Sequence, residues 1–122
     1  MVMDVKETQI TPTLNRVKMV VIKTARNGVV NEDTLFEFSE EDNAISAVYS
    51  GGKIAKGFLV GTRVLDNLSF SYCQLQTDGK LDNGSSHCYL KLNEEGKIQL
   101  VENFEWQSRP GENGINIFQQ IN

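Results

Sequence analysis

The stretch "AVYSGGKIAKGFLVG", residues 47–61, decides the fold class. Two segments rich in β-branched and aromatic residues flank Gly51-Gly52, a dipeptide typical of the tight turn of a β-hairpin. The stretch therefore predicts two antiparallel strands that are neighbours in space.

Two glycines lie inside the second of these strands. Side-chain alternation puts Gly57 and Gly61 on the face opposite Ile54, Phe58 and Val60. Glycine weakens a strand, but it permits the sharp coiling or close approach of a neighbour that a small barrel requires. We interpret this segment as a bent barrel strand. The alternative is that the glycines leave room for a ligand.

The rest of the chain repeats the pattern of short alternating segments separated by turn signals. The predicted strands cover residues 16–25, 34–39, 44–50, 53–65, 68–76, 87–92, 97–108 and 115–121. The separating turns include Asn27-Gly28, Asp78-Gly79 and the polar cluster 82–86. No segment sustains a helical pattern of apolar residues. The sequence predicts an all-β fold: about eight antiparallel strands in an up-and-down meander, closed into a barrel that leaves no free edges.

Length and charge limit the possible organisation and partners. Residues 1–15 lack a periodic pattern and are predicted to form a tail or an edge segment, and residues 16–122 a single barrel domain. The formal net charge of −4 counts against nucleic acid or an anionic membrane as a partner. The N-terminus lacks the basic start and apolar stretch of a signal peptide, so we expect a cytoplasmic protein.

Several polar residues interrupt faces that are otherwise apolar. Glu102 is in register with Leu100 and Phe104, on the face expected to point inward, where a carboxylate is costly unless it is paired or hydrated. Gln74 and Gln119 also continue apolar faces. Together with inward-pointing aromatic residues they could line a polar-tipped ligand cavity. The candidate ligand-binding residues are Tyr49, Tyr72, Gln74, Glu102, Phe104, Trp106 and Gln119.

Two other interpretations of these features stay open. An ion pair between Arg16 and Glu102 across the barrel would make the polar residues a closed structural network. Phe118 and Val101, apolar residues on faces that are otherwise polar, would instead suit a protein-interaction scaffold or a homodimer.

The sequence offers little for catalysis or metal binding. His87 is the only histidine, and it points to the opposite face from its neighbour Cys88. We expect His87 on a solvated face, and Cys73 and Cys88 as small buried residues. No catalytic residue, metal or cofactor is predicted.

The run "YSGGKIAKGFLVG", residues 49–61, together with "FEW", residues 104–106, resembles a family of small bacterial proteins catalogued as N-acetylglutamate synthases. The resemblance spans roughly residues 16–106 and implies a compact β-meander similar to avidin, streptavidin or lipocalin barrels. The catalogued activity would use acetyl-CoA. The sequence, however, shows neither a glycine-rich loop opening a helix for the pyrophosphate nor a cluster of arginines for glutamate. The sequence therefore favours a non-enzymatic barrel that binds a small apolar or amphipathic molecule.

Overall fold

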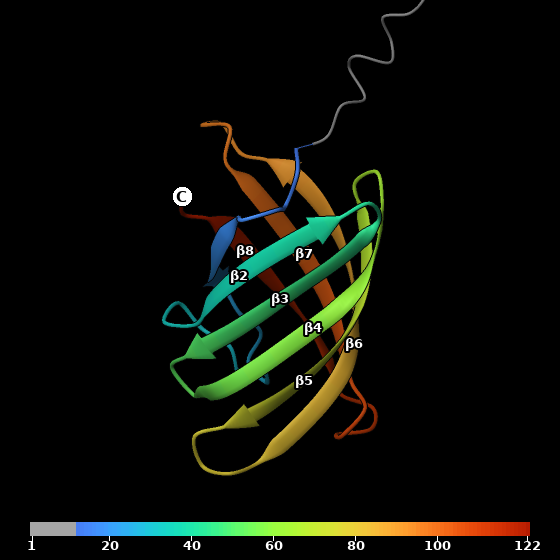
Figure 1. The fold of residues 1–122 in the computed structure, drawn as a ribbon. Helices are drawn as coiled ribbons and strands as arrows, with labels where there is room; N and C mark the ends of the chain where they lie inside the picture. The colour runs from blue at the N-terminus through green and yellow to red at the C-terminus, as the bar shows by residue number, and fades with distance from the viewer. Residues whose placement is uncertain (1–11) are drawn as a thin grey trace, which may run out of the picture.

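The chain folds into one closed barrel of eight antiparallel strands, seen in a computed structural model that describes residues 12–122 (Figure 1). The strands are β1 (Lys18–Lys23), β2 (Leu35–Glu41), β3 (Ala44–Gly51), β4 (Ile54–Val64), β5 (Asn67–Gln76), β6 (Leu81–Leu92), β7 (Ile98–Trp106) and β8 (Asn113–Gln120). The predicted fold class is confirmed. Residues 12–122 contain no helix, and hence none long and apolar enough to cross a membrane.

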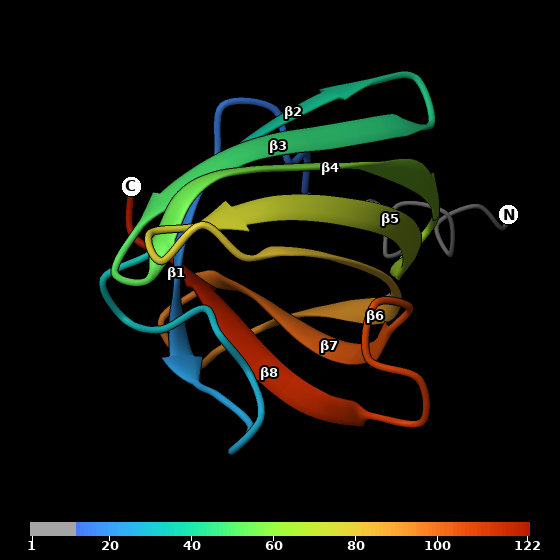
Figure 2. The ribbon, with the colours of Figure 1, turned by 90° about the horizontal axis from the view of Figure 1, so that it is seen from below.

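Each strand pairs with the next one in sequence, and the barrel closes where β1 meets β8 (Figure 2). In this closing pair Val20 lies opposite Gln119, and Val21 lies opposite Phe118. Burial alternates along the strands. In β5, for example, Leu68, Phe70 and Tyr72 are buried while the residues between them are exposed. The core is therefore the barrel interior, and the outer face is solvated.

The two glycines of β4, Gly57 and Gly61, face this interior, where neighbouring strands leave no room for a side chain. Gly57 lies opposite Tyr49 of β3, and the tyrosine ring occupies the space that a Cβ atom would need. At Gly61 the space is taken by the neighbouring strand β5 itself, by the Ser69 carbonyl and the Cα and Cβ atoms of Phe70. Phe58 and Val60 lie on the face opposite the glycines, as predicted, and this face points outward. Ile54 is buried instead, because a β-bulge between Ile54 and Lys56 reverses its direction. The close-approach interpretation of the glycines is confirmed.

One predicted turn is present without its hairpin, and another is wrong. The chain turns at Asn27, where the Gly28 N–H donates to the Ala25 carbonyl at 3.0 Å, but β1 pairs with β2 only through Lys18 and Met19, and residues 24–34 form a long connection. The cluster 82–86 belongs to strand β6. Its small polar residues read locally as a turn, but barrel partners for Asp82 and Ser86 override that preference.

Both ends of the barrel are closed by the chain itself. At one end Arg63 of β4 forms an ion pair with Glu40 at 2.9 Å, and the same Glu40 oxygen accepts the backbone N–H of Leu14 at 2.8 Å. Leu14 is fully buried there, although it lies in the segment predicted as a tail or edge. The rest of that segment, residues 1–11, lies outside the described residues. At the other end, residues 24–34 cross the barrel and bury Val29 and Val30.

Three further expectations are corrected by the packing. Cys73 points outward and is exposed, whereas Cys88 is buried as predicted. Phe118 is part of the core, so it cannot support an outer interaction surface. Arg16 is exposed and forms no ion pair with Glu102, whose partners are neutral side chains.

Candidate functional site

A small cavity lies inside the barrel, toward the end crossed by residues 24–34. Its volume is about 30 Å³, which is room for about one or two water molecules. Gly28, Val29 and Val30 of the crossing segment form one wall. Anything larger than a few atoms must therefore displace this segment or the side chains around it.

Aromatic rings form most of the remaining wall. The ring centroids of Phe36 and Tyr49 are stacked 4.3 Å apart, and Phe118 meets Phe36 edge-on at 4.6 Å. On the other side Trp106 meets Tyr72 edge-on at 5.6 Å. Such contacts hold the rings in place, so the cavity presents a preformed apolar surface.

Three polar atoms on this wall have no hydrogen-bond partner in the structure: the Tyr72 hydroxyl, Nε2 of Gln74 and Nε1 of Trp106. The other end of the Gln74 amide is satisfied, since the Tyr49 hydroxyl donates to its Oε1 at 2.8 Å. An amide N–H and an indole N–H can only donate, and a tyrosine hydroxyl can also donate. Three residues of the cavity wall therefore each carry a buried donor without a partner.

Glu102 is the carboxylic acid of the cavity wall. Its carboxyl is buried between strands β6 and β8, where Ser86 Oγ donates to Oε2 at 2.6 Å and Asn116 Nδ2 donates to Oε1 at 2.9 Å. Burial raises the pKa of Glu102 above its ordinary value, although both hydrogen bonds act in the opposite direction. The neutral form of this carboxyl is thereby more favoured than it would be for a glutamate in water.

Asn116 links this carboxyl to the segment that crosses the barrel. Its Oδ1 accepts the Thr24 hydroxyl at 2.9 Å and the Ala25 N–H at 3.2 Å. The backbone donor fixes the orientation of the amide, so that Nδ2 faces Glu102. One side chain thus joins the interior carboxyl to the wall of the cavity.

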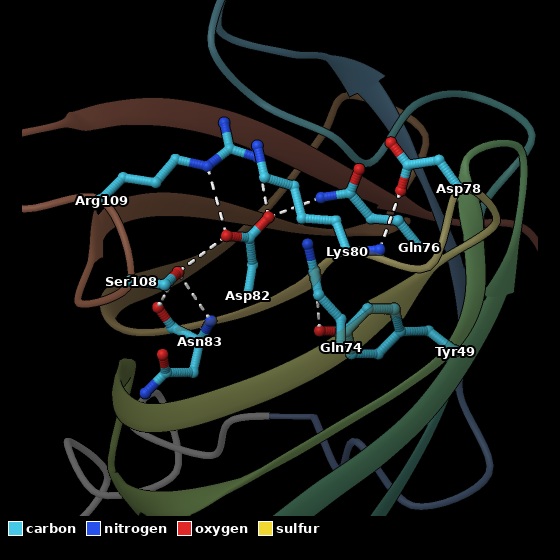
Figure 3. A network of polar contacts seen from close by, with 9 residues as sticks. All are labelled: Tyr49, Gln74, Gln76, Asp78, Lys80, Asp82, Asn83, Ser108 and Arg109. Carbon is cyan, nitrogen blue, oxygen red and sulfur yellow. Dashed lines mark hydrogen bonds and ion pairs between the residues drawn. The ribbon is translucent and has the colours of Figure 1, made fainter.

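The rim beside the cavity is held by a network around Asp82 (Figure 3). Arg109 donates to Asp82 at 2.7 Å, Ser108 at 2.8 Å and Gln76 at 2.5 Å. Burial would raise the pKa of Asp82, but the hydrogen bonds from Arg109 and Ser108 outweigh it, and the pKa lies below its ordinary value. The Arg109 guanidinium also lies over the Trp106 ring, 4.6 Å from its centroid. The network fixes the loop between β7 and β8 over one side of the cavity.

The structure brings six of the seven predicted site residues together on the cavity wall: Tyr49, Tyr72, Gln74, Glu102, Phe104 and Trp106. Gln119 is not among them. It lies on the outer face of β8, where Gln99 donates to it at 2.8 Å. The inward residues of β8 are Asn116 and Phe118, so the expected facing of this strand was shifted by one residue, which exchanges its two faces.

Sequence reasoning missed Asn116, Ser86 and the wall formed by residues 28–30. Asn116 could have been found, because it lies two positions before Phe118 on the same face of one strand. Ser86 and Gly28 fall in predicted turns, and Val29 and Val30 fall between two predicted strands, so no local signal indicates that they face the interior.

In the part of the chain that the structure describes, the outer face offers no comparable arrangement of reactive groups. His87 is exposed, as predicted, and its Nδ1 lies 3.3 Å from the Ser69 hydroxyl. Within residues 12–122 no group of three or more histidine, cysteine, aspartate or glutamate side chains is placed to hold a metal ion.

Comparison with known proteins agrees with the barrel. A family model described as avidin-like protein matches residues 12–121. Nothing matches among curated proteins, and nothing matches among solved structures. The match covers almost the whole chain, all eight strands included, and the chain therefore belongs to the avidin-like protein family.

Proposed function

We propose that the protein is a non-enzymatic binding protein that holds a small ligand inside its barrel. Eight-stranded barrels have an interior just wide enough to be filled by side chains or to hold one small ligand. Here the interior is almost filled, and what remains is a small aromatic cavity with three unpartnered donors.

The unpartnered donors carry the proposal. Leaving a buried polar group without a partner costs about 1–3 kcal/mol, and native proteins rarely tolerate several in one place without a reason. A ligand with an acceptor oxygen, such as a carbonyl, would satisfy the Tyr72, Gln74 and Trp106 donors, while its apolar part contacts the rings. The ligand class is therefore a small amphipathic molecule with at least one acceptor oxygen.

The size of the cavity adds a requirement. The ligand must be only a few atoms long, or the wall formed by residues 28–30 must move outward as it enters. Outside the apolar packing of Val29 and Val30, the segment 24–34 is tied to the barrel by the Thr24 and Ala25 contacts to Asn116, a bond from Asn27 Nδ2 to the Asn113 carbonyl at 3.2 Å and one from Thr34 Oγ1 to the Gly51 carbonyl at 3.1 Å. We expect this segment to order further when a ligand is bound.

The proposal is tested by titrating the isotope-labelled protein with propionamide, a small probe with one acceptor oxygen. Trp106 is the only tryptophan, so its indole N–H gives a single NMR signal from the cavity wall. We expect a saturable downfield shift as that N–H gains a partner. Tyr72→Phe removes one donor and should weaken binding several-fold. Tyr89→Phe, the same change at an exposed tyrosine, should leave it unchanged. An indole signal that does not respond would contradict the proposal.

Acetyl transfer, the catalogued activity of the bacterial proteins that the sequence resembles, is less well supported. Acetyl-CoA is far larger than the cavity. Calorimetry should detect no binding of acetyl-CoA, and clear binding would reopen the enzymatic interpretation.

A second candidate function, self-association through the barrel wall, is favoured by a different observation. Four apolar side chains on the outer faces of β3, β4 and β6 are about half exposed or more: Val48 (47%), Phe58 (50%), Val60 (63%) and Leu81 (67%). Phe58 lies between Val48 and Cys73 of the neighbouring strands, so part of this set is contiguous. A concentration-dependent dimer in light scattering, lost in Phe58→Ser, would support this function. A monomer at high concentration would exclude it.

A further inference from the structure

The interior carboxyl of Glu102 has hydrogen-bond acceptor positions that no side chain of residues 12–122 uses. An ionised carboxylate offers about four acceptor positions, and Ser86 and Asn116 use one on each oxygen. Both partners are neutral, and Glu102 forms part of the cavity wall. A group in the cavity can therefore reach a carboxylate that is only partly satisfied.

No cation of the protein faces this carboxyl within residues 12–122. The two ion pairs found there, Arg63–Glu40 and Arg109–Asp82, use other carboxylates. The titratable groups facing Glu102 from the packed strands are Tyr49 of β3, Tyr72 of β5 and Cys88 of β6. Burial raises the pKa of each, so all three are neutral at physiological pH. On the partner strand β8 the facing group is the Asn116 amide.

The rings around the cavity also favour positive charge. The faces of Phe, Tyr and Trp are electron-rich and attract ammonium groups, more strongly when water is excluded. Phe36, Tyr49 and Phe104 line the cavity together with Glu102, and the fourth ring, Trp106, already attracts the Arg109 guanidinium. A carboxyl without a cation, enclosed by aromatic rings, is a site suited to a small organic cation.

We propose that the ligand carries a protonated amine that lies beside Glu102, in addition to an acceptor oxygen directed at the three donors. This inference rests on the proposed function, because it specifies the ligand of the same cavity. The ligand class is small amino compounds with a carbonyl or carboxylate oxygen a few bonds from the nitrogen.

Below the pKa of Glu102, which burial raises, binding then exchanges a proton for a cation. Without ligand, burial favours the neutral carboxylic acid. As the ammonium group enters, the carboxylic acid releases its proton to solvent, and the carboxylate pairs with the ammonium, which keeps all its protons. The interior gains no net charge. The affinity consequently rises with pH until Glu102 is ionised in the free protein, and above that pH it stays constant.

Glycinamide and propionamide test the proposal, because they have the same number of heavy atoms and the same amide. They differ in carrying an ammonium or a methyl group at the other end. Both are titrated into the full chain between about pH 4.5 and 7, where the amine of glycinamide is protonated. The Trp106 indole signal reports binding, and the variants are Glu102→Gln and Glu105→Gln. Glu105 is exposed on the same strand, so its substitution is the matched control.

We expect wild type to bind glycinamide about tenfold more tightly than propionamide at the upper end of this range. Below the pKa of Glu102, glycinamide affinity should fall by up to about tenfold per pH unit, while propionamide affinity stays constant. Glu102→Gln should abolish both the preference and the pH dependence, and Glu105→Gln should retain them.

Two other results overturn the proposal in distinguishable ways. Propionamide binding as tightly as glycinamide in wild type would refute the cation while leaving the interior binding site intact. A Trp106 signal that responds to neither probe would remove both the cation and the proposed function.

Discussion

Replacing each of the three tyrosines of the chain by phenylalanine should change the free energy of unfolding in a different way at each position. The Tyr72 hydroxyl is buried without a partner, the Tyr49 hydroxyl is buried and donates to Gln74 at 2.8 Å, and Tyr89 is 45% exposed. Replacement by phenylalanine removes only the oxygen and keeps the ring.

Tyr72→Phe should stabilise the protein without ligand. Removing a buried hydroxyl that lacks a partner relieves a cost of about 1–3 kcal/mol. We expect about 1 kcal/mol, because the adjacent cavity can admit a water molecule, and hence a rise of about 4 °C in the melting temperature. Tyr49→Phe should destabilise by about 1–3 kcal/mol, since it leaves Oε1 of Gln74 buried and unpartnered. Tyr89→Phe should change stability by less than about 0.5 kcal/mol.

The assay is urea unfolding followed by Trp106 fluorescence, with the free energy taken from the midpoint and slope. If Tyr72→Phe proved as destabilising as Tyr49→Phe, the Tyr72 hydroxyl would have a partner in the free protein. The argument from unpartnered donors would then fail. A stabilised Tyr72→Phe that also binds propionamide less tightly would show that the hydroxyl serves binding at the expense of stability.

Three further predictions concern other parts of the barrel. Gly57→Ala places a methyl group against the Tyr49 ring and should destabilise the protein by about 1–3 kcal/mol in thermal unfolding. Lys56→Ala, at the exposed neighbouring position, should change the stability little. Equal effects of the two substitutions would contradict the close packing at Gly57. The pKa of Asp82 is lowered in the folded state, so ionised Asp82 stabilises the protein above the ordinary carboxyl pKa, and this stabilisation is lost as pH falls below about 4. The free energy of unfolding of Asp82→Asn, measured across the same acid range, should lack that loss. An unchanged acid sensitivity would exclude the Arg109 pairing. The pKa of Glu102 is raised, so the folded state holds its proton more tightly than the unfolded state. The free energy of unfolding therefore falls as pH rises from about 4 through the pKa of the folded state. Glu102→Gln should abolish this fall, and a variant whose stability depends on pH as that of the wild type does would contradict the raised pKa.

The barrel could be predicted from the sequence because its determinants are local. Strand alternation and short turns indicate an antiparallel meander, and Gly57 and Gly61 indicate close approach inside a small barrel. Glu102 and Gln74 could be recognised as candidate site residues for the same reason, since each is a polar residue that continues a strand face of apolar residues. Their inward direction follows from the residues on either side of them.

The rest depends on contacts between distant segments. The path of residues 24–34 across the barrel end is set by bonds to Asn116, more than eighty positions later, and Asn27-Gly28 alone resembles a hairpin turn. The inward direction of Asp82 and Ser86 follows from Arg109 and Glu102, and Gln119 was misplaced because a one-residue shift exchanges the faces of a strand. No sequence pattern shows which buried donors stay unpartnered.

The central claim is that the barrel interior holds a small ligand, and native mass spectrometry of the protein purified from its own cells tests it most directly. We expect a reproducible added mass that disappears on denaturation, that is reduced in a Tyr72→Phe, Trp106→Phe double variant, and that persists in Tyr89→Phe. A bare polypeptide mass in the wild type, or an added mass indifferent to the interior substitutions, would contradict the account.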